Sequence, residues 1–305
     1  MAYILETMAL TKMYGQKAAA KDINMHIEEG KIYGLIGRNG AGKTTIMRMI
    51  SGLSTPTSGS YSLFGETGLK MKRMLKNVGV LIEHPGLFPK LSGYENLKIK
   101  CLGLGIKPKG YVEELMKTVG FKPEDADKKA DSYSLGMRQR LGIALALIGE
   151  PKLLVLDEPI NGLDPQGIVE VRRILARLRD ERGISVMISS HILDELSKLA
   201  DVYGIISEGC LIDEFTTDEL ESRTGLCVMI RSGEGQKTLD VLKGIGITKA
   251  AIDKEGLVRV EERLEETAAM AEAIIRAGIP LHEIYHHNAT LEDYYLSKTG
   301  GNVNA

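Results

Sequence analysis

Residues 37–44, which read GRNGAGKT, constrain the fold of this chain more than any other stretch. They fit the pattern G-x-x-x-x-G-K-[ST], in which a glycine-rich loop is followed by a lysine and a hydroxyl residue. The apolar residues 32–36 before the pattern predict a buried strand, and residues 44–50 after it predict a helix. Because strand, loop and helix follow one another, we interpret the stretch as a phosphate-binding loop rather than as an accidental match in a glycine-rich turn.

The chemistry of this loop predicts a bound nucleotide with Mg²⁺. Glycines allow successive backbone N–H groups to point inward at phosphate oxygens, and the helix N-terminus adds partial positive charge at the same point. Lys43 can reach the β- and γ-phosphates, and the Thr44 hydroxyl can ligate Mg²⁺.

Length and composition limit the class of protein. The 305 residues, 43% of them hydrophobic, suffice for one large domain or two modest ones. A net charge of −2 gives no basis for a nucleic-acid partner held by bulk charge, and we expect none. The three cysteines form no C-x-x-C pair, which suits a reducing cytosol. The N-terminus lacks a signal-peptide pattern, and the apolar run 141–148 is far below the ~20 residues of a membrane helix. We therefore expect a soluble chain whose membrane role requires a partner.

Two kinds of pattern alternate along residues 1–215. Residues 3–30 predict short strands of an antiparallel sheet, and residues 86–150 predict an inserted helical subdomain with helices near 91–104, 111–119 and 136–149. Around this insertion, buried strands alternate with amphipathic helices, which is typical of a largely parallel sheet. Residues 202–206 and 210–214 predict a hairpin across Glu208-Gly209.

The composition shifts near residue 216. Residues 216–305 predict the element order β-α-β-β-α-β with a final helix, the split βαβ pattern of ferredoxin-like domains. The predicted fold class is therefore α/β. A phosphate-binding-loop core at 1–215 carries an antiparallel β subdomain and the inserted helical subdomain, and a small α+β accessory domain follows at 216–305.

Two acids, Asp157 and Glu158, end a predicted buried strand and are followed by Pro159. Since Pro159 prevents a helix from continuing there, we expect the acids at the carboxyl edge of the sheet, where α/β proteins build their sites. Asp157 can hold the hydration shell of Mg²⁺, and Glu158 can accept a proton from an attacking water. Tyr14 lies in a loop-like context where an exposed ring could stack on a purine, and the alternative from the residues alone is a half-buried tyrosine at a strand end.

Taken in order, these motifs resemble the ATP-binding subunits of ABC transporters over about residues 3–215. Residues 37–45 match the family's Walker A loop, and residues 153–158 match Walker B. Residues 134–140, SLGMRQR, stand where the family has its signature sequence, and residues 161–164, NGLD, match its D-loop. His191 matches the switch histidine of the family, and Tyr14 falls where the family has an aromatic residue that stacks on adenine.

The resemblance implies that two such domains pair head to tail, with ATP between the Walker A loop of one and the signature of the other. It implies Glu158 and His191 as the catalytic residues, and Thr44, Glu83 and Asp157 as the Mg²⁺ ligands. The implied nucleotide-binding residues are Tyr14, Gly37, Asn39, Gly40, Ala41, Gly42, Lys43, Thr44, Thr45, Ser134, Gly136 and Asp164.

Two positions depart from the usual family pattern. The signature usually contains Gly-Gly-Gln, whereas this chain has Leu135-Gly136-Met137 and keeps only the glycine that needs close backbone approach. The loop that enters the helical subdomain usually begins with Gln, whereas this chain has Glu83. That acid, the following residues up to 89 (EHPGLFP) and residues 291–296 (LEDYYL) are similar to the bacitracin-export and lantibiotic-immunity branch of the family.

The resemblance thus implies the ATP-hydrolysing motor subunit of an exporter for a peptide antibiotic, a lantibiotic or another drug. Its implied partners are an integral-membrane permease and a second ATPase subunit, as a homodimer or heterodimer, and its implied place is the cytoplasmic face of the cell membrane. The alternative is a non-transport ATPase switch of the same fold that acts on another macromolecule, such as the ribosome or damaged DNA. A kinase with a phosphate-binding loop is a third class, but it would need neither the signature nor His191.

Overall fold

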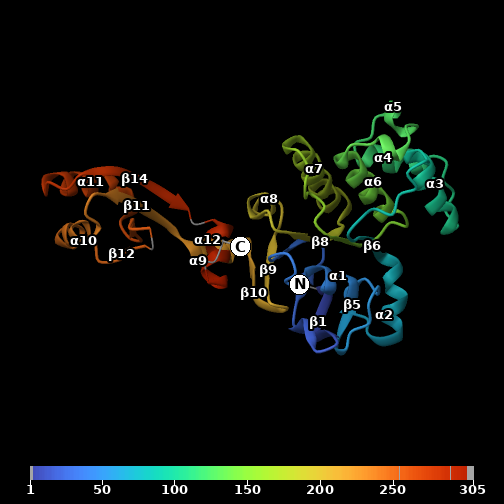
Figure 1. The fold of residues 1–305 in the computed structure, drawn as a ribbon, viewed down its shortest axis with the longest axis horizontal. Helices are drawn as coiled ribbons and strands as arrows, with labels where there is room; N and C mark the ends of the chain where they lie inside the picture. The colour runs from blue at the N-terminus through green and yellow to red at the C-terminus, as the bar shows by residue number, and fades with distance from the viewer. Residues whose placement is uncertain (1–2, 254, 289, 301–305) are drawn as a thin grey trace. The chain divides into compact units, whose positions relative to one another are not determined.

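The computed structural model describes residues 3–253, 255–288 and 290–300 of the chain (Figure 1). The chain divides into two compact units, residues 1–217 and 218–305. The first unit contains all the residues of the predicted nucleotide site. Within the described ranges, no helix is both long and apolar enough to cross a membrane.

A six-stranded sheet forms the centre of the first unit. In sheet order its strands are β10 (Cys210–Thr216), β9 (Val202–Ser207), β4 (Ile32–Ile36), β8 (Ser185–Ser190), β7 (Leu153–Leu156) and β6 (Val78–Leu81). The last five are parallel, and β10 pairs antiparallel with β9 across Glu208-Gly209, as predicted. Every residue of β4, β7 and β8 is buried, because a parallel sheet is covered on both faces, and this explains their nearly continuous apolar sequences.

Helices follow three of the parallel strands. They are α1 (Lys43–Ile50), α7 (Pro165–Arg182) and α8 (Leu193–Ser197). The sequence specifies both ends of α7: the Asp164 carboxylate accepts a hydrogen bond from the Gly167 N–H at 2.9 Å, and Gly183 ends the helix with a left-handed φ of 62°. Fixed helix ends matter here because α1 and α7 begin at the carboxyl edge of the sheet, where the predicted site lies.

A second sheet is antiparallel, as the sequence predicts for residues 3–30. Its strands are β2 (Lys17–Ile23), β1 (Tyr3–Tyr14), β3 (His26–Glu28) and β5 (Ser58–Leu63), and β5 also pairs with β1. The two sheets share one hydrophobic core, in which Leu5 and Ile27 of this sheet pack with Leu35 and Val155 of the central one. The helix α2 (Gly68–Met74) and the 3-10 turn η1 (Leu75–Asn77) then lead from β5 to β6.

A partly buried carboxylate also links the two sheets. Glu214 of β10 accepts hydrogen bonds from the Tyr33 hydroxyl at 2.8 Å and from the His26 N–H at 2.9 Å. Burial, together with the charge of Glu214, raises the pKa of Tyr33 well above its usual value, so the phenol stays a hydrogen-bond donor. The end of β10 is therefore fixed against β3 and β4 immediately before the second unit begins.

Residues 86–150 form the predicted helical insertion. Its helices are α3 (Gly93–Gly103), α4 (Tyr111–Thr118), α5 (Pro123–Ala126) and α6 (Leu135–Leu147), with a 3-10 turn η2 (Ala130–Ser132) before α6. Ser92 and Glu95 form a capping box that starts α3. The sequence did not predict α5, because four residues are too few to give a helical period.

The second unit begins with α9 (Thr217–Thr224) and contains a four-stranded antiparallel sheet in the order β12-β13-β11-β14. One core joins Val228 and Val258 of the sheet with Leu242 and Ile274 of the helices. In chain order the elements are β11 (Leu226–Ser232), α10 (Gly235–Gly244), β12 (Ala250–Ile252), β13 (Val258–Val260), η3 (Leu264–Glu266), α11 (Thr267–Arg276), β14 (Leu281–Asn288) and α12 (Leu291–Thr299).

The helical insertion packs tightly on the edge strand β6. A Cβ at Gly79 of β6 would lie 2.2 Å from the Ala146 carbonyl oxygen of α6, and a Cβ at Gly142 of α6 would lie 2.7 Å from Pro85 Cβ. Neither position has room for a side chain. The helix that carries the signature sequence is thereby fixed to the strand that leads into Glu83.

We predict that Gly79→Ala lowers the free energy of unfolding by about 1–3 kcal/mol, because the added methyl group has to push α6 away from β6. Gly103→Ala is the matched control, since a Cβ at the end of α3 would meet no atom within 4 Å. Denaturation of both variants measures the difference. Equal stability of the two variants would contradict the tight α6–β6 contact.

Candidate functional site

The loop of residues 37–42 joins the buried strand β4 to α1, and its packing leaves no room for side chains at two of its glycines. A Cβ at Gly42 would lie 2.4 Å from the Ala19 carbonyl oxygen, and a Cβ at Gly37 would lie 2.6 Å from the Ile206 carbonyl oxygen. Gly42 also has a φ of 112°, a conformation open in practice only to glycine. The structure thus gives a steric reason for the sequence pattern.

Lys43 begins α1, and its side chain is only 4% exposed. Its Nζ donates a hydrogen bond to the Gly37 carbonyl oxygen at 2.5 Å and lies 3.1 Å from Glu158 Oε1. A buried ammonium needs a compensating charge, and Glu158 supplies it. The predicted phosphate-binding cation and the predicted catalytic carboxylate are therefore in direct contact.

Asp157 follows β7 and is held by two hydroxyl groups. Thr44 Oγ1 donates to Asp157 Oδ2 at 2.7 Å, and Ser189 Oγ donates to Asp157 Oδ1 at 2.6 Å. Asp157 is 6% exposed and Ser189 is fully buried. Both carboxylate oxygens are thus fixed in place, which brings together the two predicted Mg²⁺ ligands Thr44 and Asp157.

Glu158 is fixed from three sides. Its N–H donates to Ser189 Oγ at 2.8 Å, its Oε1 faces Lys43, and its Oε2 lies 2.8 Å from His191 Nδ1. Its φ of 48° lies in the left-handed region, which a residue other than glycine rarely adopts. The structure therefore brings both predicted catalytic residues, Glu158 and His191, to the carboxyl edge of the sheet.

Lys43, Thr44 and Glu158 line a pocket with a volume of about 670 Å³, and Asp157 and His191 are not part of its lining. Tyr14 lines its wall, and this side chain is 52% exposed, as a ring that stacks on a purine has to be. Lys17, Glu208 and Gly209 also line the pocket and were not predicted, because they belong to two hairpin turns that only folding brings near the loop. The lining comprises Tyr14, Lys17, Ala18, Ala19, Arg38, Asn39, Gly40, Gly42, Lys43, Thr44, Thr45, Glu158, Glu208 and Gly209.

Three predicted nucleotide-binding residues lie elsewhere. Ser134 and Asp164 are exposed and cap the N-termini of α6 and α7, and Gly136 lies in the first turn of α6. None of the three lines the pocket of the same chain. Gly37 and Ala41 are also absent from that lining. The Ala41 carbonyl oxygen accepts a hydrogen bond from the Gly209 N–H at 2.9 Å and so holds the loop against the β9–β10 turn.

Glu83 is placed beside an arginine. Arg48 Nη2 lies 2.5 Å from Glu83 Oε1, and the Glu83 side chain is 57% exposed. The family resemblance groups Glu83 with Thr44 and Asp157 as a Mg²⁺ ligand, but it does not anticipate Arg48, which is 35 residues away in the chain. No sequence signal identifies this pair, because Arg48 reads only as a basic residue in the last turn of a helix.

An apolar groove of about 470 Å³ lies beside Glu83. Three exposed hydrophobic residues line it, Leu53 at 65%, Phe88 at 54% and Ile99 at 42%. The full lining comprises Leu53, Val80, Leu81, Ile82, His84, Pro85, Gly86, Phe88, Asn96, Ile99, Lys100, Gly142 and Leu145. The groove therefore joins the end of β6 to α3 and α6.

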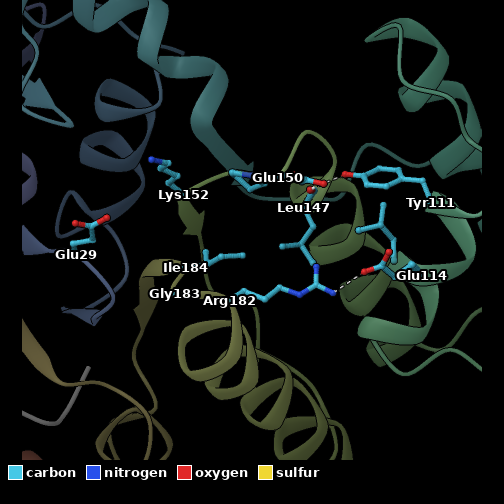
Figure 2. Close-up of a pocket in the computed structure, with 11 residues that line it drawn as sticks. Glu29, Tyr111, Glu114, Leu147, Glu150, Lys152, Arg182, Gly183 and Ile184 are labelled. Carbon is cyan, nitrogen blue, oxygen red and sulfur yellow. Dashed lines mark hydrogen bonds and ion pairs between the residues drawn. The ribbon is translucent and has the colours of Figure 1, made fainter.

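Another pocket, of about 450 Å³, lies at the opposite edge of the central sheet (Figure 2). Lys152 and Ile184 line it, and they immediately precede β7 and β8. Arg182, at the end of α7, reaches Glu114 of α4, with 3.2 Å between Nη2 and Oε1 (Figure 2). This ion pair joins the helical subdomain to the core, and the pocket is separate from the nucleotide site.

Comparison with known proteins identifies the family. Residues 20–161 match the sequence profile described as ABC transporter. The chain is 40% identical over 303 residues to the bacitracin transport ATP-binding protein BcrA of Bacillus licheniformis, with 99% of each chain covered. The chain belongs to the ABC transporter family. It is also 45% identical over 219 residues to the lantibiotic transport ATP-binding protein SrtF of Streptococcus pyogenes, which covers 72% of this chain and 93% of that one.

A solved structure supports the same assignment. The structure of cbiO1 from Clostridium perfringens, part of the ABC transporter complex cbiONQ, superposes with a TM-score of 0.66 at 28% identity. The superposition covers 81% of this chain and 98% of that one. The fold class predicted from the sequence is therefore confirmed.

Family membership settles the broad function. The chain is the ATP-binding subunit of an ABC transporter, an ATPase whose hydrolysis is coupled to transport, and it binds nucleotide. ATP-binding subunits of this kind act within multi-subunit transporters, as the place of cbiO1 in the complex cbiONQ illustrates. The alternative of a non-transport ATPase is thereby disfavoured.

We predict that Ser189→Ala lowers ATP turnover about tenfold or more, because Asp157 and Glu158 lose the hydroxyl that positions both. It should also lower the free energy of unfolding by about 1–3 kcal/mol, the cost of buried partners left unpaired. Steady-state ATPase assays and denaturation measure the two effects.

Ser185→Ala is the matched control. Ser185 is equally buried at the other end of β8, where its Oγ accepts a hydrogen bond from the Gly30 N–H at 2.7 Å. This variant should lose comparable stability and keep its turnover number. Normal turnover in Ser189→Ala would contradict the positioning role of Ser189.

Proposed function

We propose that this chain is the ATP-hydrolysing subunit of an exporter for a peptide antibiotic of the bacitracin or lantibiotic class. The observation that carries the proposal is the extent of the likeness. Two relatives named for bacitracin transport, from Bacillus licheniformis and Enterococcus faecalis, match 99% of this chain, so the match includes the second unit. The sequence features around Glu83 point to the same branch.

In this proposal Lys43 exchanges the Glu158 carboxylate for the phosphates of ATP. In the structure its ammonium contacts the Glu158 carboxylate at 3.1 Å. The β- and γ-phosphates carry more negative charge than a single carboxylate, so they attract Lys43 away from Glu158. Glu158 Oε1, which is buried and accepts no hydrogen bond, then becomes available to a water molecule.

Two neighbouring residues of the site also fit Mg²⁺. Thr44 Oγ1 and Asp157 Oδ2 are hard oxygen donors only 2.7 Å apart, and Mg²⁺ prefers such ligands. We assign Thr44 and Asp157 to hold the ion, directly or through its waters. When bound, Mg²⁺ neutralises charge that develops on the phosphates.

In this proposal Glu158 acts as general base for the attacking water. His191 orients the γ-phosphate and this water. The contact between Glu158 Oε2 and His191 Nδ1 leaves only Oε1 to accept the proton. A positioned carboxylate of this kind accelerates proton transfer by about 10²–10⁴-fold. The left-handed backbone at Glu158 fits this role, since strained conformations gather at functional sites.

A second ATPase subunit, identical or related, completes the site. Ser134 and Gly136 lie at the exposed N-terminus of the 13-residue helix α6, which has no acidic residue in its first turn and so favours an anion. A Cβ at Gly136 would meet no atom closer than 3.9 Å, so packing within this chain does not require the glycine. Close approach of a nucleotide held by the partner subunit explains why position 136 is a glycine. Asp164, exposed at the N-terminus of α7, belongs to the same surface.

We predict that Glu158→Gln retains ATP binding and lowers ATP turnover at least about 100-fold, because an amide cannot accept the proton. ATP affinity should not fall, since the change removes a competing carboxylate from Lys43. Glu208→Gln, in the turn that lines the same pocket, is the control and should keep turnover close to wild type. Turnover at the wild-type rate in Glu158→Gln would refute Glu158 as the base.

We assign the apolar groove beside Glu83 to the permease. Leu53, Phe88 and Ile99 line it and are 65%, 54% and 42% exposed, and exposed apolar side chains that gather at one place are typical of an interaction site. An amphipathic segment from a cytoplasmic loop of the permease would cover these side chains. The subunit would then lie on the cytoplasmic face of the cell membrane.

We predict that Phe88→Glu releases the subunit from membranes of cells that produce the complete transporter, because a charge cannot be buried against an apolar segment. The ATPase activity of the isolated subunit should persist, since Phe88 is half exposed and does not line the nucleotide pocket. Leu69→Glu, on α2 and 79% exposed, is the control outside the groove. Membrane fractionation and survival in the antibiotic measure the effect, and equal retention of both variants would count against this assignment.

A further inference from the structure

Lys12 and Tyr14 lie two residues apart at the end of β1, and positions with this spacing share one face of a strand. Lys12 Nζ lies over the Tyr14 ring, 5.3 Å from the ring centroid. An ammonium group at this distance is attracted by the negative charge on the face of an aromatic ring. A side chain of the same strand therefore already covers one face of Tyr14.

The Lys12 ammonium group is also fixed by the segment that follows α1. Its Nζ donates a hydrogen bond to the Thr55 carbonyl oxygen at 2.7 Å. Two further hydrogen bonds hold this segment against β1. The Met13 N–H donates to Thr57 Oγ1 at 3.0 Å, and the Thr57 N–H donates to the Thr11 carbonyl oxygen at 2.8 Å. Because the cation is anchored at a second point, it restrains the ring instead of moving with it.

The other face of the Tyr14 ring is open to a ligand. Tyr14 lines the pocket of the phosphate-binding loop and is 52% exposed, whereas Lys12 is half-buried and does not line this pocket. Lys12 therefore covers the face of the ring that is turned away from the pocket. A flat group in the pocket, such as a nucleotide base, can stack on the opposite face.

We propose that Lys12 is a positioning residue for the nucleotide base and that it acts through the Tyr14 ring. The proposal deepens the proposed function, because it takes Tyr14 as the side chain that stacks on adenine. A ring that is already held in place loses less conformational freedom when the base binds. The cation also attracts the negative charge of the ring, which reduces the repulsion between ring and base when they stack face to face.

A purely structural role for Lys12 makes a different prediction. If Lys12 only held residues 55–57 against β1, its removal would weaken the binding of every triphosphate to the same extent, with or without a base. A role through the Tyr14 ring affects only ligands that carry a base. The two roles are separated by comparing a nucleotide with tripolyphosphate, which has a chain of three phosphates and no base.

The test is calorimetry of the full chain with Mg²⁺ and either a non-hydrolysable ATP analogue or tripolyphosphate. Lys21→Ala, which removes an exposed charge from β2 outside the pocket, is the control for net charge. Relative to this control, Lys12→Ala should weaken binding of the analogue about two- to fivefold, the contribution of an exposed cation–π contact, and leave binding of tripolyphosphate unchanged. Lys12→Arg keeps a cation over the ring and should bind the analogue as the wild-type chain does.

The decisive comparison is the Tyr14→Ala background. Tyr14→Ala alone should weaken binding of the analogue at least about fivefold, because one stacked base is lost. There Lys12→Ala should cause no further loss, since the ring through which Lys12 acts is gone.

An equal loss in both backgrounds, or no loss in either, would overturn the inference about Lys12. Unchanged binding of the analogue by Tyr14→Ala would also overturn it, because Tyr14 would then not contact the base. Failure of the wild-type chain to bind the analogue would instead overturn the proposed function.

Discussion

The two hydrogen bonds that Asp157 accepts hold the functional edge of this protein together. One comes from Thr44, at the start of the helix that follows β4, and the other from Ser189, at the end of β8. Since β4, β8 and β7 are neighbours in the sheet, these bonds tie three adjacent strand ends to one carboxylate. Glu158 comes next in the chain and uses the same serine, so the position of the base depends on the position of the metal ligand.

The sequence predicted the parts of the site that depend on local pattern. The phosphate-binding loop needs its glycines and its Lys43-Thr44 pair in consecutive positions, and the acids at 157 and 158 directly end an apolar run. The inserted helices and the antiparallel sheet also follow from periodicity. Parallel strands place their carboxyl ends at one edge, and for this reason Asp157 and Glu158 could be expected there, whereas His191 was implied by the family resemblance.

The sequence could not predict the contacts that depend on packing between distant segments. Ser189 lies within an apolar strand and reads as a core residue, although it positions two acids. The pairs Lys43–Glu158 and Arg48–Glu83 join segments that come together only after the sheet has formed. Ser134 and Gly136 were included through the family resemblance alone, and within one chain they do not line the pocket.

The burial of Lys43 has a thermodynamic consequence for ATP recognition. An ammonium whose side chain is 4% exposed has already lost nearly all of its hydration in the folded protein, where Glu158 compensates its charge. The desolvation cost therefore belongs to folding and not to ligand binding. When ATP binds, the Lys43 ammonium is already desolvated and oriented, and only its counter-ion has to change. This preorganisation makes the contact selective for highly charged phosphates over singly charged anions.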